Sequence, residues 1–181
     1  MHIKLLTKYY FINTLDTNNL KKQDKETLII FRNYSSSNIN ISKLIKLKNF
    51  LKKKGNKFFL ANNFKLALKF RLDGVYIPSF NKDFNHLAYS TYLNFAVIGS
   101  AHSLKEIRTK EIQKVQQIFI SSIFKKNKNY LGLNKFKILG KYTEKKVIAL
   151  GGISKKNIKK IKLTNVSGIA GISYFKQKKG P

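Results

Sequence analysis

The stretch VIALGGISKKNIKKI, Val147 to Ile161, decides the fold of this 181-residue chain. Its short apolar run is typical of a strand buried on both faces and leads directly into Gly151-Gly152. Ser154 follows as a helix cap, so the stretch predicts a strand, a glycine turn and a helix in succession. Backbone N–H groups after such glycines form a cradle for an anion, although glycine is also the default residue of a tight turn.

The same alternation of short β-branched or aromatic runs with amphipathic stretches extends along the whole chain. Eight strands interleaved with helices predict a parallel sheet, and eight is the number that closes a (β/α)8 barrel of the TIM type. An open, flavodoxin-like sheet is the structural alternative. The expected strands are Tyr9–Asn13, Thr27–Arg32, Lys57–Ala61, Gly74–Ile77, Phe95–Gly99, Gln117–Ser121, Val147–Leu150 and Gly168–Ser173.

The clearest helical pattern begins at Ser42, has apolar residues at Leu44, Leu47 and Leu51, and ends near Gly55. The segment 14–26 is too polar for a convincing first helix, and 33–40 is a polar loop. The chain is also shorter than the roughly 200 residues at the lower end of the usual range for this fold. We therefore expect one small α/β barrel domain over residues 1–181 with shortened N-terminal helices. Further helical patterns span Asn63–Phe70, Lys82–Tyr92, Ser103–Val115 and Ser154–Leu163.

The charge of the chain is its most extreme property, with a formal net charge of +29 at pH 7. Arg32, Arg71 and Arg108 are its only arginines, and bidentate base contacts depend mainly on arginine. Lysines are spread along the whole chain, which favours a solvated basic surface over a specific nucleic-acid partner. The chain has no cysteine, and its sequence shows neither an apolar run long enough to span a membrane nor a signal peptide. We expect a cytoplasmic protein with no membrane partner, whose oligomeric state the sequence leaves open.

A second glycine-rich segment, SGIAGISYF, ends the last expected strand at Ile172 and Ser173. In barrels of this type a phosphate site is commonly built from the loops that follow strands seven and eight. Gly151, Gly152, Ile172 and Ser173 are therefore expected to bind a phosphate group.

These two closing segments resemble those of thiamin phosphate synthases and their TenI-type relatives. The stretch from Phe58 to Val75 is similar to the family's strand, helix and "ADGVH" run. Residues 98–103 (IGSAHS) resemble its "IGVSxHS" motif, and 131–133 (LGL) its "PLGL". The resemblance covers roughly residues 56–175 and is specific in the order and spacing of its motifs. It implies a barrel enzyme that joins two phosphorylated small molecules, an aminopyrimidine pyrophosphate and a thiazole phosphate, with Mg²⁺ and release of pyrophosphate.

The resemblance also assigns the residues of the pyrophosphate side. Arg32 matches the arginine of the family's "QLREK" strand end, where the glutamine and lysine are replaced. The family's "ND" pair, whose aspartate binds magnesium, aligns with Ala61-Asn62, or with Asn62-Asn63 if one residue shifts, and neither register supplies a carboxylate. Asn62 is expected to contact the substrate phosphates. The second such aspartate has no match in register, and Asp83 could substitute only if the loop is rebuilt. Ser100 is expected near the pyrophosphate, so Arg32 and Ser100 are the catalytic candidates, and magnesium binding is expected to be weakened or lost.

The family's "GPxFPTxTK" loop corresponds to residues 121–129. Lys126 and Lys128 replace its threonines, and their ammonium groups are expected to bind phosphate. Ser122 stands where the tautomerase relatives carry a histidine, which argues against tautomerase chemistry. His102 either contacts substrate or packs near the surface at a helix start; the second interpretation is favoured because the sequence identifies no partner carboxylate for it. His2 and His86 are assigned no role.

Three functions follow in decreasing order of support. The first is a divergent thiamin phosphate synthase. The second is a non-catalytic or repurposed relative that binds a phosphorylated small molecule, supported by the missing carboxylates. The third, a lysine-rich nucleic-acid-binding module, is supported by charge alone.

Overall fold

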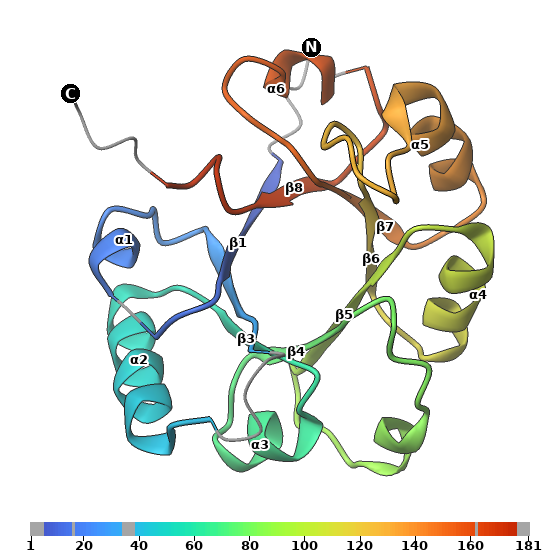
Figure 1. Ribbon diagram of the computed structural model, residues 1–181. Helices are drawn as coiled ribbons and strands as arrows, with labels where there is room; N and C mark the ends of the chain where they lie inside the picture. The colour runs from blue at the N-terminus through green and yellow to red at the C-terminus, as the bar shows by residue number, and fades with distance from the viewer. Residues whose placement is uncertain (1–5, 16, 34–38, 162, 177–181) are drawn as a thin grey trace.

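The chain folds into a closed barrel of eight parallel strands in the order β1 to β8. The computed structural model describes residues 6–15, 17–33, 39–161 and 163–176. Figure 1 looks along the barrel axis and shows the strands as a ring with the helices outside it. The ring closes where β1 pairs with β8, Thr7 lying opposite Gly168. The predicted (β/α)8 barrel is therefore confirmed, and the open flavodoxin-like sheet is wrong.

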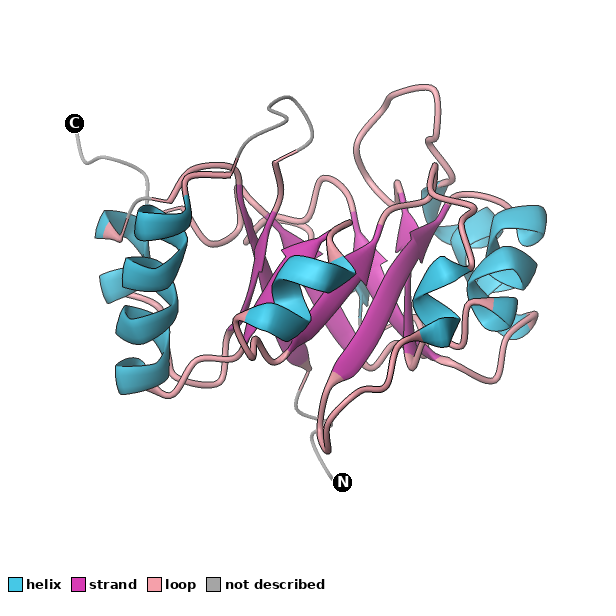
Figure 2. Cartoon of the chain, turned by 90° about the horizontal axis from the view of Figure 1, so that it is seen from below, coloured by secondary structure: helices cyan, strands magenta, loops and turns pink. Residues whose placement is uncertain are grey.

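The strands lie where the apolar runs placed them, within one or two residues at each end. They tilt between flanking helices, as seen from the side in Figure 2. The strands are β1 Thr7–Ile12, β2 Leu28–Phe31, β3 Phe58–Ala61, β4 Gly74–Ile77, β5 Ala96–Ala101, β6 Gln117–Ser121, β7 Lys146–Leu150 and β8 Gly168–Gly171. The helices are α1 Asn18–Lys21, α2 Ile41–Lys54, α3 Phe64–Lys69, the 3₁₀ helix η1 Asn85–Ala88, α4 Leu104–Ile112, α5 Gly132–Lys141 and α6 Ile158–Ile161.

The small size of the barrel comes from shortened connections. The polar segment after β1 contains a single helical turn, α1, as expected, and the pattern over residues 82–92 yields only the short η1. The sequence did not predict α5, because its N-cap residue Leu131 offers no side-chain cap and thus no start signal. The predicted cap of α2 was two residues late. Asn40, not Ser42, accepts the Lys43 N–H.

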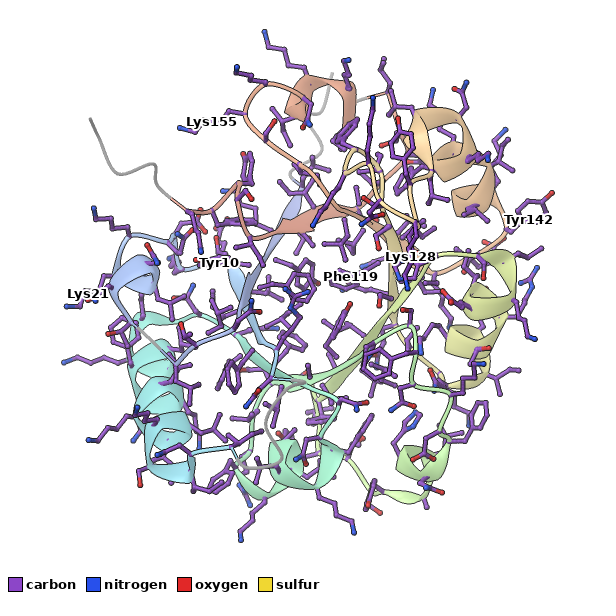
Figure 3. All side chains as sticks on the ribbon, viewed as in Figure 1. Tyr10, Lys21, Phe119, Lys128, Tyr142 and Lys155 are labelled. Carbon is purple, nitrogen blue, oxygen red and sulfur yellow. The ribbon has the colours of Figure 1, made fainter. Side chains whose placement is uncertain are left out.

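Alternate residues of each strand point into the barrel and fill it with aromatic rings. Phe119 lies at the centre of this interior, as Figure 3 shows. Its ring centroid lies 4.8 Å from that of Tyr9, 5.5 Å from that of Tyr76 and 6.1 Å from that of Phe11. Two further apolar clusters lie between the strands and the helices. The barrel is thus a packed core, and ligands are confined to its mouth at the carboxyl ends of the strands.

Within the described residues, no helix is both long and apolar enough to cross a bilayer. His2 and residues 34–38 of the polar loop lie outside the described residues.

Candidate functional site

A cavity of about 260 Å³ opens at the carboxyl ends of the last three strands. It brings together five residues predicted for the site, from segments as far apart in sequence as β2 and β8. The lining residues are Phe11, Arg32, Ser121, Ser122, Lys125, Asn127, Leu150, Gly151, Gly152, Gly171, Ile172 and Ser173. We refer to this space as the mouth cavity.

The two glycines after β7 adopt backbone conformations that other residues rarely take, with φ of 103° at Gly151 and 73° at Gly152. A Cβ atom on Gly151 would lie 2.4 Å from Ser122 Oγ, and one on Gly152 would lie 2.5 Å from the Lys125 nitrogen. The Gly151 carbonyl also accepts the Phe124 N–H at 2.9 Å. Both glycines therefore serve a purpose the sequence did not reveal, close packing against the loop that follows β6.

Backbone donors line this part of the mouth cavity. In the described part of the chain, the N–H groups of Gly152 and Ser173 have no hydrogen-bond acceptor. Ser154 opens the helical turn through its backbone, because its carbonyl accepts the Ile158 N–H at 3.0 Å and its N–H donates to Asn157 Oδ1 at 2.9 Å. Asn157 Nδ2 in turn donates to the Gly152 carbonyl at 2.8 Å and so fixes the glycine turn.

Arg32 continues the inward-facing positions of β2 past the end of the strand. Its guanidinium carbon lies 4.7 Å from the centroid of the Phe11 ring, within the range of a cation–π contact. Nη2 donates to Asn13 Oδ1 at 3.3 Å, whereas Nε is buried with no partner among the described residues. A buried donor without a partner is costly, so an acceptor on a ligand would relieve it.

The basic loop after β6 presents different residues from those predicted. Lys125 and Asn127 line the mouth cavity, whereas Lys126 and Lys128 are exposed and do not. The residues that line the cavity therefore precede the predicted ones by one position. Ser122 holds the loop in this conformation, since its N–H donates to the Asn129 carbonyl and its Oγ donates to the Lys125 carbonyl. Lys128 lies at the rim of the ring in Figure 3.

The opposite side of the mouth is closed by hydrogen bonds within the protein. Asn62, which has a φ of 59°, accepts a hydrogen bond on Oδ1 from Asn81 Nδ2 at 2.5 Å. Asp83 accepts from both the backbone N–H and the side-chain amide of Asn85, at 2.7 and 3.0 Å. Neither Asn62 nor Asp83 lines the mouth cavity. Asn81 was missed from the sequence, although its place in the loop after β4 marks it as a candidate at the mouth.

Ser100 is buried on the inward face of β5, with 4% of its surface exposed. Its side chain is hydrogen-bonded to the Tyr76 hydroxyl. Burial raises the pKa of Tyr76 to about 12, against the lowering effects of this hydrogen bond and of the Arg32 charge. The tyrosine is therefore neutral at pH 7, and neither Tyr76 nor Ser100 lines the mouth cavity.

The two described histidines have structural partners. The ring Nδ1 of His102 lies 2.7 Å from the Ser121 carbonyl oxygen, which can only accept, so Nδ1 carries the proton. The His102 backbone N–H donates to Glu106 Oε2 at 2.6 Å, which anchors the start of α4. His86 stacks on Phe64 and bonds the Gln113 carbonyl through Nε2. His102 thus supports the end of β6 from behind the mouth cavity.

The residues present do not fit a magnesium ion of the kind the resemblance implies. Mg²⁺ prefers anionic oxygen ligands in octahedral geometry. Among the described residues, no three His, Cys, Asp or Glu side chains are grouped so that they could hold a metal. Asn62, at the expected ligand position, is a neutral amide whose oxygen already accepts a hydrogen bond.

Comparison with known proteins identifies the family. A model of the family described as thiamine monophosphate synthase matches residues 16–175. The chain belongs to the thiamine monophosphate synthase family. The sequence-based recognition is therefore confirmed.

Relatives within this family are distant. A protein of Aquifex aeolicus described as a candidate thiamine-phosphate synthase is 31% identical over 175 residues, covering 93% of this chain and 92% of its own. The thiamine-phosphate synthase of Methanococcus vannielii is 27% identical, with 64% of this chain matching 58% of its length. The matched region thus spans under two thirds of that relative.

Solved structures support the fold. Thiamine phosphate pyrophosphorylase from Pyrococcus furiosus superposes with a TM-score of 0.72 at 23% identity, covering 92% of this chain and 86% of that chain. A structure described as native KDPGal superposes with a TM-score of 0.66 at 13% identity. At these identities the likeness shows the shared barrel fold alone.

Proposed function

We propose that this protein is a thiamin phosphate synthase that joins an aminopyrimidine pyrophosphate to a thiazole phosphate. The observation that carries the proposal is the mouth cavity, which is lined by Arg32 together with Gly152 and Ser173. Guanidinium groups and convergent N–H groups both bind phosphate oxygens. The family match over residues 16–175 gives these donors their substrates.

The proposed roles follow from the chemistry. The bond between the pyrimidine methylene carbon and the pyrophosphate oxygen breaks, and the electron pair leaves with pyrophosphate. The thiazole nitrogen then donates its lone pair to the resulting cation and forms the new carbon–nitrogen bond. This reaction needs stabilisation of the leaving group more than a general base.

Arg32 supplies positive charge that stabilises the leaving group. Its Nε, which has no partner among the described residues, is the donor for a pyrophosphate oxygen. Gly151, Gly152, Ile172 and Ser173 hold the thiazole phosphate, with Lys125 adding charge at the edge of the cavity. Lys126 and Lys128 would serve as part of the wider basic surface that attracts both substrates. Ser100 is buried and hydrogen-bonded to the Tyr76 hydroxyl, and neither residue lines the mouth cavity, so Ser100 acts through the tyrosine rather than directly on pyrophosphate.

A second candidate function is a family member that binds a phosphorylated small molecule without turning it over. It is favoured by the amide pair Asn62–Asn81 and by the buried Ser100, because both place expected catalytic groups in contacts within the protein.

The test is direct synthesis of thiamin phosphate. Purified protein is incubated with both substrates, with and without Mg²⁺, and the product is read by thiochrome fluorescence. Product formation that disappears in Arg32→Met supports the synthase. Thiazole phosphate binding with no product under either condition would instead establish the binding protein.

A further inference from the structure

We propose that this barrel binds the pyrophosphate of its substrate without a divalent metal ion, with guanidinium and ammonium groups in place of magnesium. The inference rests on the proposed function and concerns the same site. It starts from the observation that the expected metal position is occupied by a closed amide pair.

Most of the carboxylates that the structure describes are located away from the mouth. Of the seven acidic residues that the structure describes, five belong to the amino end of the barrel, where each strand begins. They precede strands or, in one case, lie in the last turn of α4. These five are Asp24, Glu26, Asp73, Glu111 and Glu144.

The other two acids are held by hydrogen bonds from their own loops. The Asp83 carboxylate accepts from the Asn85 N–H and side-chain amide, and Glu106 accepts the His102 N–H. Neither lines the mouth cavity. The described lining of the mouth cavity therefore offers no carboxylate to compensate the charge of a dication.

Where a metal would be expected, the structure places two neutral side-chain amides in contact with each other. Asn62 and Asn81 are hydrogen-bonded to each other, and the Asn81 backbone carbonyl accepts from Lys110 Nζ at 2.8 Å. Gln113 Nε2 donates to the same carbonyl at 3.2 Å. Lys110 has no exposed surface, so an ammonium group is buried behind the loop that would have to receive the metal.

Fixed cations are available for the anion instead. Arg32 Nε is buried in the mouth without a partner, and Lys125 lines the same cavity. The chain carries 37 lysines and arginines against 8 acids, so its field concentrates anions and repels dications. A pyrophosphate bound bidentately by a guanidinium is already compensated in charge.

The experiment measures inorganic pyrophosphate binding by isothermal titration calorimetry, once in EDTA and once in excess Mg²⁺. We expect wild-type protein to bind in EDTA with an affinity within about threefold of that in Mg²⁺, after correction for the Mg²⁺–pyrophosphate complex. Arg32→Met should weaken binding at least tenfold in EDTA. Circular dichroism confirms that each variant is folded.

A gain-of-function variant sharpens the test. Asn62→Asp combined with Asn81→Asp should lower pyrophosphate affinity in EDTA at least tenfold and recover it in Mg²⁺, because two carboxylates restore a metal site. Asp83→Asn is the matched control, and it should bind equally to wild type in both buffers.

The outcomes are distinct. Wild-type binding in EDTA supports the proposal. Binding that requires Mg²⁺ overturns it and leaves the synthase function standing. Absence of pyrophosphate binding in both buffers overturns the metal-free site together with the proposed synthase.

Discussion

The two sides of the barrel mouth are built from different kinds of chemical group. At the ends of β7 and β8, the cavity is lined by glycines and small residues, and the N–H groups of Gly152 and Ser173 have no acceptor among the described residues. At the ends of β3 to β5, the groups are side chains that bond to one another, Asn62 to Asn81 and Tyr76 to Ser100. A backbone site persists while its glycines persist, whereas a side-chain site changes with a single substitution. A single substitution is therefore expected to affect the side-chain half of the mouth more readily than the backbone half.

The largest loss of stability is expected from a substitution in the glycine turn after β7. Gly152→Ala combines a positive φ with a clash against the Lys125 nitrogen, so we expect a loss of about 4 kcal/mol in the free energy of unfolding. Urea denaturation measures it. Gly171→Ala is the matched control, since a Cβ there meets nothing within 4 Å. Equal losses in the two variants would contradict the packing role of Gly152.

The buried ammonium group of Lys110 should make the free energy of unfolding depend on pH. Burial lowers the pKa of Lys110 to about 8, with Glu106 acting weakly in the opposite direction. Between pH 8 and about 10.5 the unfolded chain holds a proton that the folded protein has released, so this group makes stability rise with pH. Below pH 8 both states are charged and its penalty is constant.

Lys110→Met should abolish that rise, which we expect to be about 2–3 kcal/mol. The measurement is the difference between wild-type and variant unfolding free energies at pH 7.5 and 10. Lys105→Met, a substitution of an exposed lysine on the same helix, is the control. A difference between wild type and Lys110→Met that does not change with pH would show that Lys110 is not buried as an ammonium.

Arg32 connects the two sides, and its loss should affect binding more than stability. Arg32→Lys keeps the charge but removes the guanidinium fork, so we expect pyrophosphate affinity to fall about tenfold. Stability should change by under about 1 kcal/mol, because Nε has no partner among the described residues and the Nη2 bond to Asn13 is long, at 3.3 Å. Calorimetry and urea denaturation separate the two effects. Arg108→Lys, on the outer surface of α4 beside Glu111, should leave the affinity unchanged.

The smallest effect should separate the two candidate caps after the glycine turn. Asn157→Ala removes both its bond from the Ser154 N–H and its bond to the Gly152 carbonyl, at a cost of about 1 kcal/mol. Ser154→Ala should cost only a few tenths, because the Ser154 backbone and not its hydroxyl takes part. Both losses are measured by urea denaturation. A larger loss in Ser154→Ala than in Asn157→Ala would show that the Ser154 hydroxyl caps the helix, as the sequence predicted.

The sequence by itself determined the barrel and the position of the glycine-rich strand ends at one half of its mouth. Eight short apolar runs at regular intervals require a parallel sheet, and parallel strands place their carboxyl ends at one edge. Gly151, Gly152 and Ser173 were therefore predictable, because their position depends on the strand they follow. Arg32 was predicted from the resemblance of its strand end to that of the family, and in the structure it extends the inward-facing alternation of β2.

Only the tertiary structure decided which side chains meet. Whether Lys125 or Lys126 faces the cavity depends on hydrogen bonds that Ser122 makes with the far end of its loop. The Asn62–Asn81 contact joins two loops 19 residues apart, and the Tyr76 hydroxyl reaches Ser100 across neighbouring strands. Periodicity fixes the side of a strand on which a residue lies, but loop conformation and long-range packing select its partner, and these arise only when the ring of strands closes.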